Sequence, residues 1–298
     1  MTAVIETNGL AKRYGRKWAL QDCTIAVPAG KVVGLVGPNG AGKTTLLQLA
    51  VGLVEPSAGS MTVLGARPGE GAAQLERVGF VAQDTPTYAS MSVANHLRMG
   101  SYLNTSWDKA LAGRRVQQLG LDPAQKAGAL SGGQRAQLAL TLAIAKRPEL
   151  LILDEPVAGL DPLARREFLQ SLMEEVAEHG TSVVLSSHLV ADLERVCDYL
   201  VLLIASHLQL AGEVNELLAS HHRLSGPRRD LRTLPSDQEI IEESHTDKQS
   251  ILLVRPNGPV LDPTWTVTPV TLDDVVLAYM GRARDSEQSR GPGLGVVR

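Results

Sequence analysis

The chain has 298 residues, which fits one large domain or two unequal domains. Its 29 lysine and arginine residues stand against 32 acidic residues, for a net charge of −3, and only 3% of the residues are aromatic. This balance argues against a DNA-coating protein, which needs a basic excess, and against an aromatic platform for single-stranded nucleic acid.

The two cysteines, Cys23 and Cys197, stand in unrelated contexts. We therefore expect no structural zinc, and a reducing compartment. The first residues contain neither a basic region nor a long apolar run, so no signal peptide is expected. The longest apolar stretches, such as residues 200–205, fall far short of the roughly 20 residues that span a bilayer.

Short apolar runs alternate with helix-like segments as far as about residue 212. The runs at 31–36, 78–82, 150–153, 182–186 and 199–204 predict strands, and the segments at 46–51, 134–146, 163–179 and 190–196 predict helices. Near-continuous apolar strands between helices indicate a parallel sheet covered on both faces. Between 86 and 130 the pattern holds helices without strands (93–102, 106–120 and 123–127), which predicts a helical insertion.

After residue 212 this alternation weakens. Residues 213–221 predict a short helix, 224–236 a loop, and 238–244 with 251–254 two strands paired around a turn. Thr271 and Asp274 have capping-box spacing and predict a helix that ends near Gly281. The remaining polar, Gly-rich residues predict a disordered tail. The predicted division is therefore 1–217, 218–282 and a tail at 283–298.

Residues 37–45 match the phosphate-loop pattern G-x-x-x-x-G-K-[ST] between a predicted strand and a predicted helix. The glycines let backbone N–H groups turn toward phosphate oxygens, and the helix N-terminus adds positive potential. Lys43 can reach the β- and γ-phosphates, and the Thr44 hydroxyl can bind Mg²⁺. The predicted nucleotide-binding residues here are Gly37, Pro38, Asn39, Gly40, Ala41, Gly42, Lys43, Thr44 and Thr45.

Two acids, Asp154 and Glu155, follow directly on the apolar run 150–153. Ligands bind beyond the C-terminal edge of such strands in open α/β sheets. We predict that Asp154 holds Mg²⁺, directly or through water, and that Glu155 is the general base that polarises the attacking water. Alone, the pair could equally be a solvated acidic turn, and the phosphate loop favours the catalytic interpretation.

The segment Leu-Ser-Gly-Gly-Gln at 130–134 places two glycines before a predicted helix. It predicts another anion-binding helix N-terminus, although taken alone it is also common turn chemistry. It lies too far along the chain to join the first phosphate pocket by local geometry. This second phosphate-binding surface suggests that two copies share a nucleotide.

These three segments, in this order, resemble the nucleotide-binding domain of ATP-binding cassette (ABC) proteins over about residues 4–217. The resemblance implies an α/β fold, a P-loop NTPase cassette with a parallel-sheet core, an N-terminal antiparallel β subdomain and a helical insertion, followed by a small C-terminal α/β tail. It implies that Tyr14 stacks on adenine, and that Gln83 contacts Mg²⁺ and relays the nucleotide state to a membrane partner. Asp161 would lie in the loop that crosses a dimer interface, and His188 near the γ-phosphate.

The family picture also implies a mechanism, in which two cassettes clamp head to tail around two Mg²⁺-ATP. Lys43, Gln83, Glu155 and His188 of one copy would meet the γ-phosphate, while Ser131, Gly132, Gly133 and Gln134 belong to the surface that binds it from the other copy. Thr44, Gln83 and Asp154 would hold Mg²⁺. Val157 and Ala158 depart from the more usual Thr-Ser and leave the acids unchanged.

The stretch between Lys43 and Ser131 leaves no room for the long coiled coil of chromosome-maintenance cassettes. A transport subunit is therefore the leading interpretation, working with a separately encoded permease at the cytoplasmic face of the membrane and not with nucleic acid. The ending at 271–282 resembles bacterial exporter-type cassettes. Two alternatives stay open: a soluble ABC ATPase with a regulatory or assembly role, and a nucleotide switch with negligible turnover, against which Glu155 argues.

Overall fold

The computed structural model describes residues 3–84, 87–228, 238–256 and 264–289. The chain forms two compact units, Met1–Ala211 and Gly212–Arg298. The division lies upstream of the predicted boundary at 217, because helix α8 (Val214–Ala219) packs on helix α9 (Leu272–Ser289) of the second unit. Within the described ranges, no helix combines the length and the apolar character needed to cross a bilayer.

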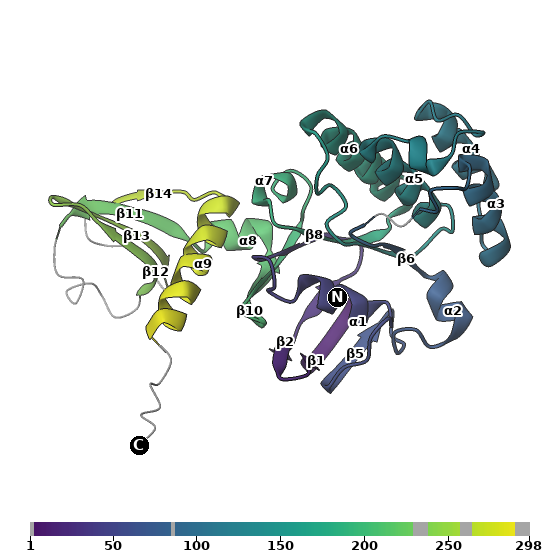
Figure 1. Cartoon of the computed structure of the whole chain (residues 1–298). Coiled ribbons are helices and arrows are strands. Elements are labelled where there is room, and N and C mark those ends of the chain that lie inside the picture. The colour runs from purple at the N-terminus through teal and green to yellow at the C-terminus, as the bar shows by residue number, and fades with distance from the viewer. Residues whose placement is uncertain (1–2, 85–86, 229–237, 257–263, 290–298) are drawn as a thin grey trace, which may run out of the picture. The chain divides into compact units, whose positions relative to one another are not determined.

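The first unit is built on a six-stranded sheet in the order β10-β9-β4-β8-β7-β6, of which Figure 1 labels β6, β8 and β10. The strands are β4 (Val32–Val36), β6 (Val78–Val81), β7 (Leu150–Leu153), β8 (Ser182–Ser187), β9 (Tyr199–Ile204) and β10 (His207–Glu213). β6, β7, β8, β4 and β9 pair in parallel, which confirms the predicted parallel core. Every residue of β4 and β7 is buried, as their uninterrupted apolar sequences predict.

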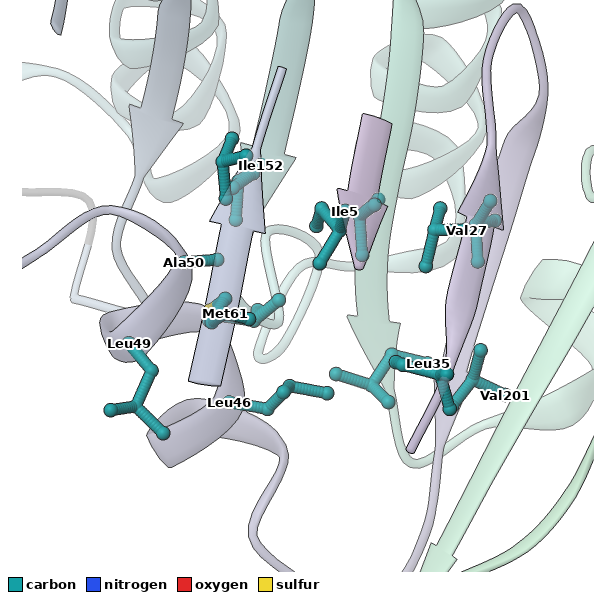
Figure 2. Packing of buried hydrophobic residues seen from close by; sticks show 14 of the residues in the cluster. Ile5, Val27, Leu35, Leu46, Leu49, Ala50, Met61, Ile152 and Val201 are labelled. Atoms are coloured by element: carbon teal, nitrogen blue, oxygen red, sulfur yellow. The ribbon is translucent and has the colours of Figure 1, made fainter. Parts of the chain in front are cut away.

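An antiparallel sheet forms the N-terminal part of this unit. Its strands are β1 (Ala3–Tyr14), β2 (Lys17–Cys23), β3 (Ala26–Pro28) and β5 (Ala58–Val63), and β1 pairs with each of the others. One apolar cluster joins the two sheets and helix α1 (Lys43–Ala50), as Figure 2 shows for Ile5, Leu35, Leu46 and Val201. Burying a side chain of this size contributes about 1.5–3 kcal/mol. The cluster therefore anchors the helix that begins at the phosphate loop.

The insertion is helical, with α3 (Val93–Leu103) and α4 (Lys109–Gln118) beside α5 (Gly132–Ile144) (Figure 1). The helix predicted at 123–127 is wrong. There the Asp122 carboxylate accepts the Ala124 N–H, and the Ala127 N–H donates to Met91, so the segment forms a turn before a short 3₁₀ helix, η1 (Ala127–Ala129). The remaining helices are α2 (Gly71–Glu76), α6 (Pro162–His179) and α7 (Val190–Leu193).

The second unit is a four-stranded antiparallel sheet in the order β12-β13-β11-β14, with α8 and α9. Its strands are β11 (His222–Pro227), β12 (Gln238–His245), β13 (Gln249–Pro256) and β14 (Thr266–Thr268). Leu224, Leu252, Val254 and Trp265 form a small core. Helix α9 contacts β12 and buries its apolar face, including Val275 and Tyr279. The predicted pairing of two strands around a turn is confirmed as β12 and β13.

Two predictions for this unit are wrong. The loop predicted at 224–236 begins inside strand β11, which is held by pairing on both edges, and residues 229–237 lie outside the described residues. Helix α9 does not end near Gly281 but continues to Ser289, so 283–289 are helical and not a disordered tail. One glycine costs a helix only about 1 kcal/mol. Arg282 offsets part of this cost by pairing with Glu239 at 2.7 Å. Residues 290–298 lie outside the described residues.

Candidate active site at the edge of the parallel sheet

The phosphate loop connects β4 to α1, and Lys43 is the first residue of that helix. Only 4% of Lys43 is exposed, and its Nζ donates to the carbonyl oxygens of Gly37 at 2.8 Å and Pro38 at 3.3 Å. Gly42 is the N-cap of helix α1, which therefore has no side-chain cap, and the first turn contains no acidic residue. Its N-terminal N–H groups and the positive end of its dipole are therefore suited to an anion.

Two positions in this loop accept only glycine. A Cβ on Gly37 would lie 2.1 Å from the carbonyl oxygen of Leu203, and one on Gly42 would lie 2.3 Å from that of Ala19. Backbone atoms of strands β9 and β2 thus lie close to the loop backbone at these two positions. The loop keeps its shape because no side chain intervenes at these contacts.

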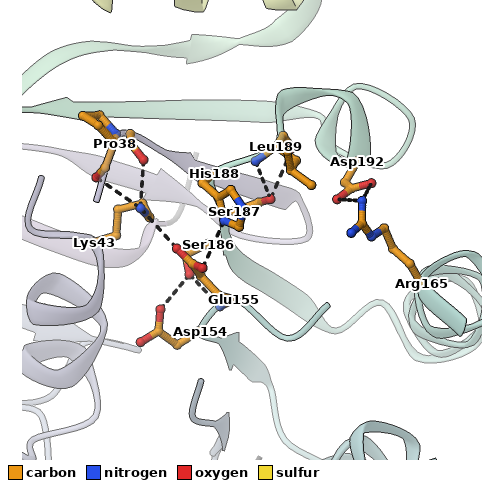
Figure 3. Close-up of polar contacts among 11 residues, drawn as sticks. Pro38, Lys43, Asp154, Glu155, Arg165, Ser186, Ser187, His188, Leu189 and Asp192 are labelled. Atoms are coloured by element: carbon orange, nitrogen blue, oxygen red, sulfur yellow. Dashed lines mark hydrogen bonds and ion pairs between the residues drawn. The ribbon is translucent and has the colours of Figure 1, made fainter. Parts of the chain in front are cut away.

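Three of the predicted catalytic side chains meet at the C-terminal edge of neighbouring strands (Figure 3). Lys43 Nζ lies 3.3 Å from Glu155 Oε1, and the other oxygen, Oε2, accepts a hydrogen bond from His188 Nδ1 at 3.1 Å. The Glu155 side chain is 10% exposed, whereas that of His188 is 45% exposed. Because β4, β8 and β7 are adjacent in the sheet, residues far apart in sequence converge here.

The structure adds a residue that the sequence analysis did not single out, Ser186 in β8. Its Oγ donates to Asp154 Oδ1 at 2.7 Å and accepts the Glu155 N–H at 2.8 Å. Ser186 is fully buried. The sequence feature that could have identified Ser186 is a serine near the end of an apolar strand, two residues before His188.

The predicted Mg²⁺ ligands differ in where they lie. Asp154 is 2% exposed and forms no ion pair within the described part of the chain, so a buried carboxylate remains without a neutralising cation. Thr44 lies half-buried in the first turn of α1, and Gln83 is exposed just after β6. Carboxylate, hydroxyl and amide oxygens suit Mg²⁺, which takes few protein ligands and keeps several waters. The donor set therefore fits this cation.

Tyr14 ends strand β1 and is 48% exposed, and Lys12 Nζ lies 5.1 Å from the centre of its ring. Trp18 is a further exposed aromatic side chain on the same hairpin, with the Arg13 guanidinium 5.3 Å from its ring. No sequence motif singles out Trp18. Both rings are accessible to a flat ligand.

The Leu-Ser-Gly-Gly-Gln segment forms the start of helix α5. Ser131 caps this helix through a capping box, since its Oγ accepts the Gln134 N–H at 3.2 Å and its N–H donates to Gln134 Oε1 at 3.0 Å. Asp161 caps α6 through its side chain alone, whose Oδ1 accepts the N–H groups of Leu163 and Ala164. Ser131, Gly133 and Asp161 line one pocket of about 250 Å³, which Lys43, Glu155 and His188 do not line. One chain therefore carries two separate candidate phosphate surfaces.

The fold and this site define a P-loop ATPase of the cassette type. A family profile described as "ABC transporter" matches residues 20–158. The "Nod factor export ATP-binding protein I" of Cupriavidus pinatubonensis is 38% identical over 232 residues, covering 74% of this chain and 69% of that protein. The "Bacitracin transport ATP-binding protein BcrA" of Enterococcus faecalis is 31% identical, covering 73% and 71%. The chain belongs to the ATP-binding proteins of ABC transporters, which hydrolyse ATP.

Solved structures agree on the fold. The "Structure of ATP binding subunit of ABC transporter" matches with a TM-score of 0.65 and 28% identity over 72% of this chain and 92% of that chain. A "Dimeric structure of a post-hydrolysis state" of an ATP-binding cassette bound to ADP and Pi matches with a TM-score of 0.63 and 20% identity, covering 70% of this chain and 98% of that chain. Cassettes of this fold thus bind nucleotide, form dimers and work in membrane transporters.

Proposed function

We propose that this chain is the ATP-hydrolysing subunit of a bacterial exporter and that two copies close around two Mg²⁺-ATP. The observation that carries the proposal is the convergence of Lys43, Glu155 and His188 at the phosphate loop. The exporter assignment is supported by relatives named for Nod factor export and bacitracin transport. The names of these relatives imply ATP as the substrate, and the geometry supports the residue roles proposed below.

Lys43 supplies positive charge to the β- and γ-phosphates. Its Nζ lies 3.3 Å from Glu155 Oε1 and bonds to the loop carbonyls. When a γ-phosphate arrives, it competes with the Glu155 carboxylate for this cation. Glu155 is thereby released from an ion pair and becomes available to take a proton from water.

His188 orients the freed carboxylate through the bond from Nδ1 to Oε2. A carboxylate only accepts, so Nδ1 carries the proton in this bond and Nε2 is left for the nucleotide side of the site. Phosphoryl transfer needs mainly positioning and charge stabilisation from the protein. Glu155 as base, with Lys43 and His188 around the γ-phosphate, meets that need.

Mg²⁺ would be held by Asp154 and Thr44, with Gln83 reaching it from the end of β6. The ion would supply the positive charge that neutralises the transferring phosphoryl group. The burial of the Asp154 carboxylate, which forms no ion pair among the described residues, supports this placement. Gln83 is exposed and therefore free to change its contacts with nucleotide state.

The second phosphate surface, formed by Ser131, Gly132, Gly133 and Gln134 with Asp161 beside it, would bind the nucleotide of the other copy. Its separation from Lys43 within one chain supports a composite site made by two chains. An identical second copy is the simplest partner, since this chain carries both surfaces. The exposed Tyr14 ring would stack on adenine.

The permease would be a separate integral membrane protein, which places the chain at the cytoplasmic face of the membrane. We assign the cassette role to the first unit, and an accessory role to the second. A relative named "ABC transporter ATP-binding protein YtrB", from Bacillus subtilis, supports treating the two as one subunit. It is 26% identical and matches 94% of this chain and 99% of that protein.

The test is affinity purification of the tagged full-length chain from detergent-solubilised membranes of its own cell, followed by mass spectrometry. The proposal predicts a stoichiometric multi-span membrane protein. A parallel purification with Glu155→Gln and Mg²⁺-ATP holds the dimer closed. Recovery of soluble partners alone in both would contradict the exporter assignment and favour a regulatory ATPase.

A further inference from the structure

The hydroxyl of Ser186 lies between the two acids that the proposed reaction uses (Figure 3). It donates to Asp154 Oδ1 at 2.7 Å and accepts the backbone N–H of Glu155 at 2.8 Å. Ser186 comes from β8 and the acids follow β7, its neighbour in the sheet. One fully buried side chain thus contacts both the candidate Mg²⁺ ligand and the candidate base.

These bonds use the hydroxyl in both of its capacities. A serine has one O–H proton and lone pairs that accept. The proton goes to the Asp154 carboxylate, which restricts its rotation, and a lone pair goes to the Glu155 backbone. Alanine at this position would leave a buried N–H and a buried carboxylate oxygen without this partner, and both would have to shift to be satisfied.

The backbone conformation of Glu155 is a second, independent observation at this contact. Its φ is +44°, a left-handed conformation that is uncommon for a residue with a side chain. Such a conformation persists only where surrounding contacts hold it, and it often marks a functional position. Here the N–H is held by Ser186 and the carbonyl oxygen accepts the Ala158 N–H at 3.1 Å. The Ser186 bond therefore helps to aim the Glu155 carboxylate between Lys43 and His188.

We propose that Ser186 is a positioning residue for ATP hydrolysis, which sets the Glu155 carboxylate for proton abstraction and the Asp154 carboxylate for Mg²⁺. The proposal rests on the proposed function and deepens it. It assigns the effect to chemistry after binding, because Ser186 contacts neither the phosphate loop nor Tyr14 in the described hydrogen bonds. Removal of the hydroxyl should therefore lower kcat and leave the KM for ATP nearly unchanged.

The test compares Ser186→Ala, Ser186→Thr and Ser182→Ala in the full-length chain, by steady-state hydrolysis at varied ATP and varied Mg²⁺. Ser182 is the matched control, since it is buried in the same strand and accepts the Gly30 N–H at 2.9 Å. It lies roughly 13 Å along β8 from Ser186. Ser186→Ala should lose about tenfold or more in kcat and need more Mg²⁺ for half-maximal rate. Ser186→Thr should recover most of the rate, and Ser182→Ala should keep it.

Thermal unfolding separates positioning from folding. Ser186→Ala and Ser182→Ala each remove one buried hydroxyl and should lower Tm by similar amounts. If Ser186→Ala does not fold, Ser186→Cys replaces it, because its thiol is a weaker donor and should give an intermediate kcat. Equal loss of kcat in Ser182→Ala and Ser186→Ala would overturn the proposal, as would a parental kcat in Ser186→Ala.

Single-turnover rates in the Glu155→Gln background test the route through Glu155. There, at saturating Mg²⁺, removing the Ser186 hydroxyl should have little further effect, because the base that it positions is already absent. A full additional loss would overturn the assignment to Glu155. Parental hydrolysis by Glu155→Gln alone would overturn the general-base assignment, and this proposal with it. An inactive Glu155→Gln beside a fully active Ser186→Ala overturns the Ser186 proposal alone.

Discussion

The Nζ of Lys43 lies 3.3 Å from Oε1 of Glu155, and both side chains are almost fully buried. The two residues come from the helix after β4 and the turn after β7, and no local pattern connects them. This ion pair joins the group that would bind the γ-phosphate to the group that would activate water. Under the proposed function, it would couple the binding of substrate to the release of the base.

Replacing Lys43 by methionine removes the cation and leaves the buried Glu155 carboxylate with His188 as its remaining ion-pair partner among the described residues. Breaking a buried pair from one side costs about 3–5 kcal/mol. We expect a lower unfolding free energy of that order and at least a tenfold loss of ATP affinity, measured by denaturant titration and by fluorescent-nucleotide binding. The control is Lys109→Met, which removes an exposed lysine at the start of α4. Parental nucleotide affinity in Lys43→Met would contradict the role of Lys43.

Ser131→Asp separates the capping role of this residue from its predicted role in the dimer. Aspartate is an equally good N-cap, so stability should stay within about 0.5 kcal/mol. Its negative charge would face the γ-phosphate of the other copy, and we expect loss of ATP-dependent dimers in light scattering. Ser92→Asp is the matched control, because Ser92 caps α3 by the same type of bond to Asn95 N–H. ATP-dependent dimers of normal mass in Ser131→Asp would exclude the composite site.

Burial of His221 in the second unit lowers its pKa. Its ring lies between the Leu217 carbonyl at 2.7 Å and the Tyr279 hydroxyl at 3.2 Å. The unfolded chain, with a pKa of about 6.5 at this residue, binds more protons than the folded chain below that pH. This contribution to stability is therefore complete above pH 6.5 and declines as the pH falls toward the lower folded-state pKa, by up to about 1.4 kcal/mol per pH unit.

Calorimetry of the full-length chain at pH 7.5 and 5.5 should thus show a lower unfolding temperature at pH 5.5 for the transition of the second unit. His221→Gln should flatten this dependence, since glutamine does not titrate. His207→Gln is the control, because His207 is exposed and lies in the first unit. An unchanged pH dependence in His221→Gln would show that other groups cause it.

Much of the first unit could be predicted because local patterns specify it. The apolar run at 150–153 and the glycine pattern at 37–45 each signal their structure without distant partners. Strand β11 could not be predicted in this way, because Gly226 and Pro227 disrupt its pattern and pairing on both edges stabilises it. In the extension of α9, Arg282 pairs with Glu239 of strand β12, a contact that the local sequence pattern does not signal.

The residues of the candidate site show the same contrast between local motifs and contacts made by distant segments. Lys43 and the acids have motifs that signal them, and the structure brings Lys43 and Glu155 together with His188. Ser186 has no motif in the sequence analysis, since its importance comes from facing Asp154 across two paired strands. The catalytic and binding roles of these residues stay predictions.

The steady-state ATPase rate of Glu155→Gln, measured beside that of the parent, tests the role of Glu155 as the general base most directly. Glutamine keeps the shape of the side chain and cannot take a proton, and a general base contributes about 10²–10⁴-fold. We predict at least a hundredfold loss of hydrolysis with ATP still bound and the Mg²⁺-ATP dimer accumulating. Hydrolysis at the parental rate would contradict Glu155 as the base.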